Sequence, residues 1–479
     1  MTNMMDEKIK SIFQDESVNK IPDSYSVFKG KNIPSYIKDW LIQKFTMEDG
    51  YLDKYSLLEF IEKFIPTKST GKTIKADLLQ NRQEKKILTR ALIEPDIRND
   101  EIRFAMPDLE IKMTEGKVDR FLLDKYNELK AGEVWGVFTL KYIPPYNNTS
   151  GYILITNYTP FKPYSIDLDY YRENRNDFNL EEWVDLLIRS MEYNPIGFVT
   201  LDQKLMFISR LLIFVEPRLN IIELAPKGTG KSYIFNNLSK NGWCVSGGTV
   251  SRAKMFYDGQ SKSFGFITRY DFVAFDEIQT IKFSDEDELK GALKNYLELG
   301  KFTIFNVSGN SEAGLILLGN IPLDRNMQPL RVNYFVELPS FFQESALLDR
   351  FHGFIEGWKL PRINEGMKVN GYTLNVEYFS EVLHSLRECP DFSIVVDDLL
   401  EIPKKSDTRD VTAVKRLTTA YLKLLFPNVR KPDDINKSDF ENFCFKPALE
   451  KRAIIREQIA YIDSEFKREM PDITLKKFT

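Results

Sequence analysis

The stretch LNIIELAPKGTGKSYIF, from Leu219 to Phe235, decides the fold of this chain. It begins with an apolar run that ends at Leu224, passes through a glycine-rich turn and enters a helix near Lys231. A strand, a turn and a helix in this order direct several backbone N–H groups and the positive end of a helix dipole at one point. We therefore predict an α/β fold with a phosphate-binding loop.

The residues APKGTGKS, from Ala225 to Ser232, match the phosphate-loop pattern G-x-x-x-x-G-K-[ST] except at the first glycine, where Ala225 stands. A coincidental glycine-rich turn is the alternative interpretation. The strand before the turn and the helix after it favour a true phosphate loop. We expect ATP to be the ligand, bound by Pro226, Lys227, Gly228, Thr229, Gly230, Lys231 and Ser232.

An acidic strand end follows further along the chain. The segment DFVAFDE, from Asp271 to Glu277, is a short apolar run that ends in two carboxylates. Parallel strands place their active residues at their carboxyl ends. We predict that Asp276 and the Ser232 hydroxyl hold Mg²⁺, which prefers oxygen ligands, and that Glu277 activates the attacking water. Solvated strand ends also carry acids, so this prediction depends on the preceding phosphate loop.

Three more polar residues complete the predicted site. Asn320 ends the apolar strand in KFTIFNVSGNSEAGLILLGN, where it would contact the γ-phosphate; a structural Asn in a turn is the alternative. Arg350 follows in QESALLDRFHGFIEGW, where an arginine finger would stabilise transition-state charge in a neighbouring subunit. Arg409, near the start of the helix TRDVTAVKRLTTAYLKLLFP, is the predicted second phosphate sensor of a lid, with Arg416 as the alternative.

Composition excludes several other chemistries. The 479 residues predict about three domains. Three separated cysteines and two histidines leave too few side chains for a zinc site or a Ser-His-Asp triad. The net charge of −4 is not that of a generally basic nucleic-acid-binding protein. Because no apolar run reaches about 18 residues and the start lacks a signal sequence, we expect a cytoplasmic protein without membrane contact.

Residue patterns divide the chain into six segments: a helical N-terminal segment (1–66), a β-rich, OB-like domain that would contact DNA (67–165), a helical connector (166–217), an ATPase core (218–360), a helical lid (361–430) and a C-terminal helical tail (431–479). Barrels of this kind often bind nucleic acid through aromatic side chains and basic loops. However, Trp135, Phe138 and Tyr142 fit a hydrophobic core better.

The start of the β-rich domain is basic. Lys68 to Arg90 contains seven basic residues against Asp77 and Glu84. A solvated surface and a contact with a nucleic-acid backbone both fit this composition, because a phosphate contact needs only fixed positive charge.

The five elements in this order resemble an AAA+ ATPase, and ALLDRFHGF resembles the arginine-finger region of the MCM-type helicase clade. SGGTVSRAKMFYD, YDFVAFDEIQTIKFSD, LLGNIPL and ALLDRFHGFIEGWKLPR are similar to the Lon-related BrxL family of BREX phage-defence systems, over about residues 130–465. The resemblance implies homo-oligomers, as hexameric or stacked rings, that encircle double-stranded DNA and act with other defence-system proteins. It transfers roles only to Lys231, Ser232, Asp276, Glu277, Asn320 and Arg350.

Members of that family usually continue into a Lon-type protease domain with a Ser-Lys dyad. Only about fifty residues follow the helix that ends near Pro427, fewer than a protease domain needs. We therefore expect ATP hydrolysis and no peptidase activity from this chain.

Three functional interpretations stay open: a DNA-engaging motor or clamp, a protein-remodelling ATPase of Lon type, and a slowly hydrolysing assembly that acts by occupying DNA. Lon-type unfoldases carry an aromatic pore loop where this chain has Ser246 to Thr249, without an aromatic residue. Phe264-Gly265-Phe266 is an alternative position for such a loop. The DNA interpretation is favoured, with the hairpin predicted within Phe302 to Leu315 as a contact.

Overall fold

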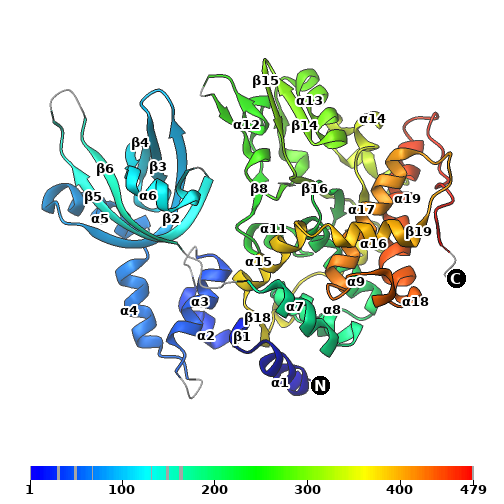
Figure 1. Cartoon of the computed structure of the whole chain (residues 1–479), viewed down its shortest axis with the longest axis horizontal. Coiled ribbons are helices and arrows are strands. Elements are labelled where there is room, and N and C mark those ends of the chain that lie inside the picture. The colour runs from blue at the N-terminus through cyan, green and yellow to red at the C-terminus, as the bar shows by residue number, and fades with distance from the viewer. Residues whose placement is uncertain are drawn as a thin grey trace. The chain divides into compact units, whose positions relative to one another are not determined.

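The structure is a computed structural model that describes residues 2–29, 33–47, 51–66, 68–130, 132–146, 150–160, 166–260 and 262–476. The chain forms two compact units: Met1–Lys20 with Ile166–Thr479, and Ile21–Ser165 (Figure 1). The predicted helical segment 1–66 is therefore divided between the two units. Its first part belongs to the larger unit because strand β1 (Ser17–Lys20) pairs antiparallel with β18 (Gly371–Leu374).

A five-stranded parallel sheet forms the centre of the larger unit. Its strand order is β17 (Gly353–Glu356), β7 (Asn220–Ala225), β16 (Gly314–Asn320), β12 (Phe272–Asp276) and β8 (Gly242–Ser246). Strands β7 and β12 are buried along their whole length, as expected for parallel strands that are covered on both faces. The predicted α/β class is confirmed.

Helices and short strands surround this sheet. The helices are α1 (Thr2–Phe13), α7 (Leu168–Asn174), α8 (Leu180–Ser190), α9 (Leu201–Ile208), α10 (Leu212–Val215), α11 (Lys231–Asn237), α12 (Arg252–Met255), α13 (Glu286–Leu299), α14 (Ser345–Leu348), α15 (Val376–Arg387), α16 (Asp391–Leu399), α17 (Thr408–Leu425), α18 (Lys437–Asp439) and α19 (Lys446–Ala460). The short strands are β9 (Thr249–Val250), β10 (Tyr257–Asp258), β11 (Ser263–Phe264), β13 (Lys282–Phe283), β14 (Lys301–Ile304), β15 (Val307–Asn310), β19 (Leu400–Glu401) and β20 (Thr474–Leu475).

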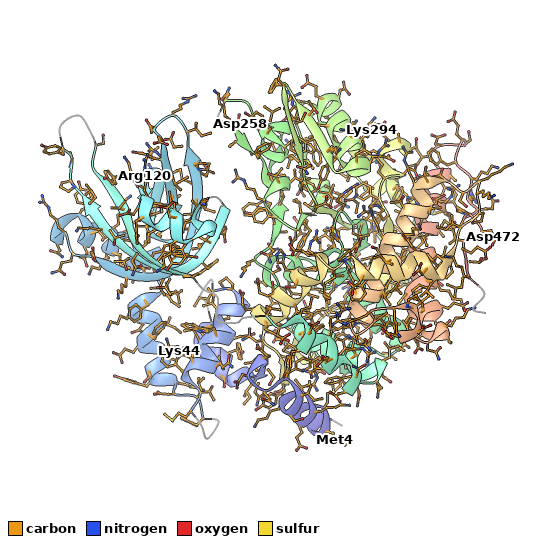
Figure 2. The ribbon with its side chains drawn as sticks, in the orientation of Figure 1. Met4, Lys44, Arg120, Asp258, Lys294 and Asp472 are labelled. Carbon is orange, nitrogen blue, oxygen red and sulfur yellow. The ribbon has the colours of Figure 1, made fainter. Side chains whose placement is uncertain are left out.

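Successive strand residues point to opposite faces of the sheet. One face belongs to a core that also takes buried side chains from α13, residues 335–351 and α19. On the other side, Phe272 at the start of β12 packs against Phe214 of α10 and Phe235 of α11, with ring centroids 4.4 and 5.9 Å away. Figure 2 shows side chains filling the space between the sheet and its helices.

Local signals in the sequence fix several helix ends. Asn179 caps α8 in a capping box: its side chain accepts from the Glu182 N–H, while the Glu182 carboxylate accepts from the Asn179 N–H. At the end of α13, Gly300 has φ +70°, a conformation that glycine adopts without strain. Both features agree with the sequence patterns. None of the helices in the described ranges is long and apolar enough to cross a membrane.

The C-terminal segment is part of the larger unit's core. Ile455 and Ile459 of α19 are fully buried, and the helix contacts edge strand β17. Strand β20 adds an antiparallel pair with β19. The segment predicted as a C-terminal helical tail from residue 431 thus contains helix α19 and packs against one side of the sheet.

A closed five-stranded barrel forms most of the smaller unit. Its strands are β2 (Lys85–Asp96), β3 (Glu101–Met106), β4 (Ile111–Val118), β5 (Gly132–Ile143) and β6 (Tyr152–Pro160), with the helices α2 (Pro22–Tyr25), α3 (Ser35–Phe45), α4 (Lys54–Phe64), α5 (Lys68–Asn81) and α6 (Arg120–Lys125). The strand order around the barrel is β2-β3-β4-β6-β5, and only the β4–β6 pair in this order is parallel.

The barrel interior is apolar. Phe138 is fully buried and stacks on Tyr158 with ring centroids 5.0 Å apart. This agrees with the interpretation of Phe138 as a core residue. Strand β2 begins at Lys85, inside the basic stretch Lys68 to Arg90, and its residues from Thr89 to Ile93 alternate between buried and partly exposed positions.

Candidate nucleotide-binding site

Four parallel strands bring the predicted site residues to one edge of the sheet. The register pairs Ala225 with Asn320 across β7 and β16, and Asp276 with Ser246 across β12 and β8. These residues all end their strands, and parallel strands end at the same edge. The sheet therefore gathers the start of the phosphate loop, the acidic pair and the predicted sensor at its carboxyl edge.

Two glycines shape the loop between β7 and α11. Gly228 has φ +84° and Gly230 has φ +81°, so both adopt backbone conformations that favour glycine. A β-carbon at position 230 would also lie 2.6 Å from the Tyr193 hydroxyl. From outside the loop, the Ile363 N–H donates to the Gly228 carbonyl at 2.7 Å. The loop thus contacts two segments that are distant in the sequence, at Tyr193 and at Ile363.

The alanine at the first glycine position fits the structure. Ala225 is the last residue of β7, lies outside the positive-φ residues and is fully buried. A β-carbon on Gly357 would lie 2.4 Å from the Ala225 methyl group. Gly357 on the neighbouring segment therefore leaves room for the Ala225 methyl group. Alanine at the first position of the phosphate-loop pattern does not distort the loop.

Lys231 is positioned at the centre of this edge. Its Nζ lies 2.9 Å from Asn320 Oδ1 and 3.4 Å from the Ala225 carbonyl. Burial lowers the pKa of Lys231, while nearby Glu223 and Asp276 oppose that shift. The structure thus brings Lys231 and Asn320, which are far apart in the sequence, into direct contact.

The acidic pair has one buried and one exposed member. Asp276 is 5% exposed, and its Oδ1 accepts the N–H of Glu277 at 2.9 Å. Glu277 is exposed and has φ +49°, which turns its side chain out of the strand direction. Ser232 is also exposed, at the start of α11. A hydroxyl and a carboxylate at this edge are suitable donors for Mg²⁺, which completes its shell with phosphate and water.

A buried ion pair between Arg210 and Glu223 supports the phosphate loop, and it was not predicted from the sequence. Arg210 and Glu223 are both fully buried, and Arg210 Nη2 lies 2.5 Å from Glu223 Oε1. Arg210 Nη1 also donates to the Thr229 carbonyl at 2.8 Å. A charged residue inside the apolar strand NIIELA was the available signal, because a buried charge needs a partner.

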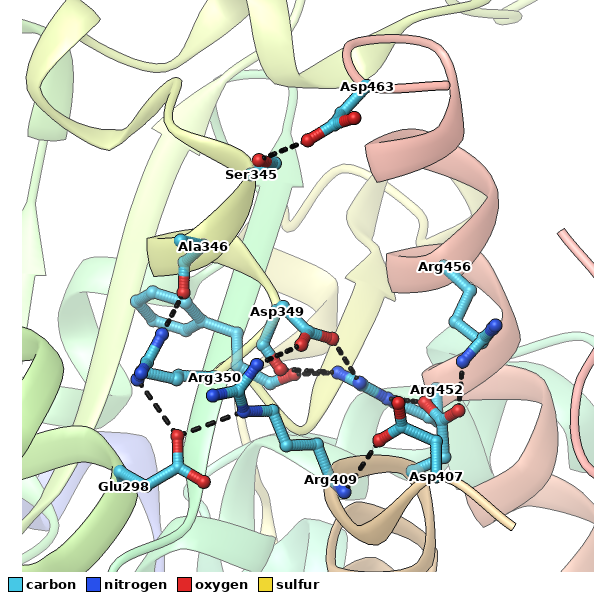
Figure 3. Close-up of polar contacts among 12 residues, drawn as sticks. Glu298, Ser345, Ala346, Asp349, Arg350, Asp407, Arg409, Arg452, Arg456 and Asp463 are labelled. Carbon is cyan, nitrogen blue, oxygen red and sulfur yellow. Dashed lines mark hydrogen bonds and ion pairs between the residues drawn. The ribbon is translucent and has the colours of Figure 1, made fainter. Parts of the chain in front are cut away.

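Arg350 and Arg409 lie near the amino end of the sheet, and Figure 3 shows both beside Glu298. His352 pairs with Asn220, the first residue of β7, so Arg350 comes just before the amino end of β17. A six-residue strand is about 20 Å long, which separates Arg350 from the phosphate loop at the far end of β7. The structure does not bring Arg350 to the Lys231 site of its own chain.

One carboxylate joins these two arginines. Glu298 Oε2 forms an ion pair with Arg350, whose Nε lies 3.0 Å away, and accepts a hydrogen bond from Arg409 Nε at 2.9 Å. Asp349 adds a second anchor, since its Oδ2 lies 2.9 Å from Arg409 Nη1 and its Oδ1 lies 2.6 Å from Arg452 Nη2. Burial, followed by the adjacent Arg409, lowers the pKa of Arg350.

The two candidates for a lid sensor share this location. Arg416 Nη1 donates to the Pro217 carbonyl at 2.5 Å, just before β7 begins. Arg409 contacts the Arg350 cluster instead of the phosphate loop. Neither arginine contacts the phosphate loop of its own chain among the contacts of the described residues, and the role of either as a second phosphate sensor stays a prediction.

Ion pairs neutralise much of the basic stretch at the start of the barrel. Within the smaller unit, Lys75 lies 2.6 Å from Glu115, Lys85 lies 3.3 Å from Asp77, and Arg90 lies 3.6 Å from Asp108. Lys72 also pairs with Glu110, at 3.5 Å. These lysines and this arginine are therefore already paired with carboxylates, whereas the sequence alone allowed them all to contact a nucleic-acid backbone.

Comparison with known proteins decides the family. The model described as "Lon-like protease BrxL-like, ATPase domain" matches residues 153–472, and "BREX system Lon protease-like protein BrxL N-terminal" matches residues 11–142. The chain belongs to the BrxL family. The first match contains every residue of the predicted nucleotide site and both arginines, so a BrxL-family ATPase domain carries them.

Two curated relatives share this family. "Lon-like protease BrxL" of Escherichia coli O9:H4 (strain HS) is 27% identical over 459 residues, which are 92% of this chain and 64% of that protein. "Lon-like protease BrxL" of Bacillus cereus (strain H3081.97) is 25% identical over 460 residues, covering 92% and 66%. The chain thus spans slightly less than two thirds of the length of each relative.

Proposed function

We propose that this BrxL-family chain is an AAA+ ATPase that hydrolyses ATP as a ring on DNA. One observation carries the enzymatic part. Lys231 contacts Asn320 at the carboxyl edge of the sheet, where β12 ends at Asp276 and the phosphate loop begins after β7. This edge combines N–H donors, a cation and carboxylates, which together suit a triphosphate with Mg²⁺.

Each residue has a defined part in the proposed reaction. The loop from Pro226 to Gly230 cradles the phosphates, and Lys231 neutralises their charge. Asp276 and Ser232 would hold Mg²⁺, whose charge polarises the phosphate oxygens. Glu277, exposed beside Asp276, accepts the proton of the attacking water.

The position of Arg350 supports the proposed ring. Its guanidinium lies at the amino edge of the sheet, away from its own phosphate loop. An arginine that stabilises transition-state charge must therefore be offered to a second copy, together with Arg409 beside it. Repeating such a head-to-tail contact closes a ring when the rotation closes. We propose a hexamer, alone or as stacked rings.

Two surfaces support DNA as the substrate of the ring. The barrel order β2-β3-β4-β6-β5, with β4 and β6 parallel and α6 between β4 and β5, supports the expected OB-like domain, a class that commonly binds nucleic acid. In the larger unit, Phe305 at the tip of hairpin β14–β15 is 68% exposed, and the Arg252 guanidinium lies 4.9 Å from its ring centre. An exposed ring and a cation can stack on bases and contact phosphates.

Protein remodelling is the second candidate. Phe264 is 42% exposed and lies on β11, and an exposed aromatic next to Gly265 suits the grip of an unfoldase on a polypeptide. Phe305 is the more exposed ring and lies beside a cation, so we favour DNA. Action in BREX-type defence with other proteins of that system is part of the same proposal, drawn from the family.

Steady-state ATP turnover tests the proposal. The full chain is assayed alone, with duplex DNA, with single-stranded DNA and with unfolded casein. We expect turnover that duplex DNA increases and casein leaves unchanged. Stimulation by casein alone would establish the remodelling function, and absence of turnover under all four conditions would refute the ATPase.

A further inference from the structure

Gln279 makes a set of hydrogen bonds that the proposed reaction has not yet used. It lies on the 3-10 turn Ile278–Thr280, two residues after Glu277. Its side chain is exposed, so hydrophobic packing does not explain its position. The side-chain amide instead reaches the end of the neighbouring strand β16.

The side-chain amide of Gln279 makes two hydrogen bonds with the backbone of Asn320. Gln279 Nε2 donates to the Asn320 carbonyl at 2.8 Å, and Gln279 Oε1 accepts the Asn320 N–H at 3.2 Å. A primary amide can make such a two-way pair because it offers a donor and an acceptor on one plane. The Gln279 side chain thus adds two hydrogen bonds between the turn that follows β12 and the end of β16.

A second carbonyl uses the remaining N–H of the same amide. Gln279 Nε2 donates to the Glu337 carbonyl at 3.1 Å, which fixes the direction of the amide plane. A β-carbon at position 319 would lie 3.0 Å from Nε2, so Gly319 leaves the room that this arrangement needs. The two donors and the acceptor of the amide are all engaged.

We propose that Gln279 is a positioning residue that sets the place of Asn320 in the ATPase site. This inference rests on the proposed hydrolysis of ATP. Asn320 Oδ1 contacts Lys231 Nζ at 2.9 Å, so the Asn320 backbone determines where its amide meets the cation and the γ-phosphate. Gln279 lies two residues after Glu277 in the sequence. Its hydrogen bonds therefore connect the segment of Glu277, the proposed base, with Asn320, the proposed water-orienting residue.

The chemistry of the amide determines which substitutions fail. A carboxylate at position 279 has no N–H for the Asn320 and Glu337 carbonyls and would repel both. A methyl group removes all three hydrogen bonds and, on an exposed turn, disturbs little packing. Displacement of a catalytic group by about 1 Å costs on the order of a hundredfold in rate.

The test measures kcat and KM for ATP of wild type, Gln279→Ala and Gln279→Glu, with Gln328→Ala as the control. Gln328 is an exposed glutamine that follows Asn320 in the same segment. We expect kcat to fall about tenfold to a hundredfold in both Gln279 variants, while KM, the affinity for a non-hydrolysable ATP analogue and the Tm stay at the wild-type values. Gln328→Ala should match wild type.

A double-mutant cycle with Asn320→Ala separates positioning from a general structural role. If Gln279 acts through the Asn320 side chain, Gln279→Ala should add no further loss to Asn320→Ala. An additive loss, or a wild-type kcat in Gln279→Ala, would overturn the inference while leaving the ATPase intact. If wild type itself shows no turnover, the proposed function fails instead.

Discussion

Lys231 and Arg350 of one chain lie at opposite edges of the same five-stranded sheet. Lys231 follows the carboxyl end of β7, whereas Arg350 precedes the amino end of the parallel neighbour β17. Under the proposed function, an ATPase site that uses both residues would combine two copies of the chain. This arrangement makes the contribution of each copy separable by mutation.

Mixing two inactive variants should restore activity. Lys231→Ala removes the phosphate cation and Arg350→Ala removes the finger, so each variant alone should lose turnover. In an equal random mixture, about a quarter of the interfaces combine an intact loop with an intact finger. We expect ATP turnover to reappear on mixing. No recovery from a mixture that forms joint rings would place Arg350 outside the neighbouring site.

Glu277→Gln should separate nucleotide binding from hydrolysis. The amide cannot accept the proton of water, so turnover should fall by about 10²–10⁴-fold. ATP affinity should stay within the range of wild type, because Asp276 and Lys231 are unchanged. Equilibrium binding of labelled ATP and steady-state turnover measure the two effects. Normal turnover would exclude Glu277 as the base.

The Arg210–Glu223 pair predicts a strongly asymmetric stability effect. Glu223→Gln leaves the buried Arg210 without its counter-charge, so the free energy of unfolding should fall by about 3–5 kcal/mol. The matched double variant Arg210→Met, Glu223→Met removes both charges and should lose less. Urea unfolding measures both. ATP affinity of the double variant should still fall, because Thr229 loses its support from Arg210.

Phe305→Ala should weaken nucleic-acid binding without lowering stability. Loss of one stacked base contact costs about 1–3 kcal/mol, or roughly 5- to 150-fold in affinity. Fluorescence anisotropy with labelled single-stranded and duplex oligonucleotides measures this loss. Ile394→Ala, which removes a 59% exposed apolar side chain from α16 of the larger unit, is the control. Equal affinity of both variants would remove the hairpin tip from the DNA surface.

His384 predicts a pH-dependent contribution to stability. The hydrogen bond that protonated His384 donates to Asp271, 2.6 Å away, raises the pKa of His384 above 6.5, while burial and Arg387 oppose the shift. A raised folded-state pKa means that the pair stabilises fully below about pH 6.5 and loses this contribution as pH rises through the folded value. The Tm difference between wild type and His384→Gln should therefore shrink from pH 6 to about pH 9. A constant difference would contradict it.

Sequence patterns predicted the parts of the site that lie in short, continuous motifs. The loop before Lys231, the pair Asp276–Glu277 and the strand ending at Asn320 each carry their signal within a few residues. The register of parallel strands then brings these ends together, so the contact between Lys231 and Asn320 follows from a correct strand assignment.

Contacts between distant segments could not be predicted in this way. Arg210 supports the loop from an earlier turn, and nothing near either segment indicates that they meet. The basic stretch was ambiguous for the same reason, since Lys75 of helix α5 pairs with Glu115 of strand β4, forty residues later. Likewise, the helix of Arg409 was recognisable, but its place beside Arg350 depends on how that helix packs.

The pairing of β1 with β18 has a consequence for synthesis of the chain. The strand ending at Lys20 meets a partner that starts at Gly371, so it leaves the ribosome about 350 residues before that partner. At roughly 5–20 residues per second this is a delay on the order of 20–70 s. The intervening barrel, whose contacts are closed within Ile21–Ser165, can complete its fold during that interval. The β1–β18 pair of the larger unit therefore forms after the smaller unit has been synthesised.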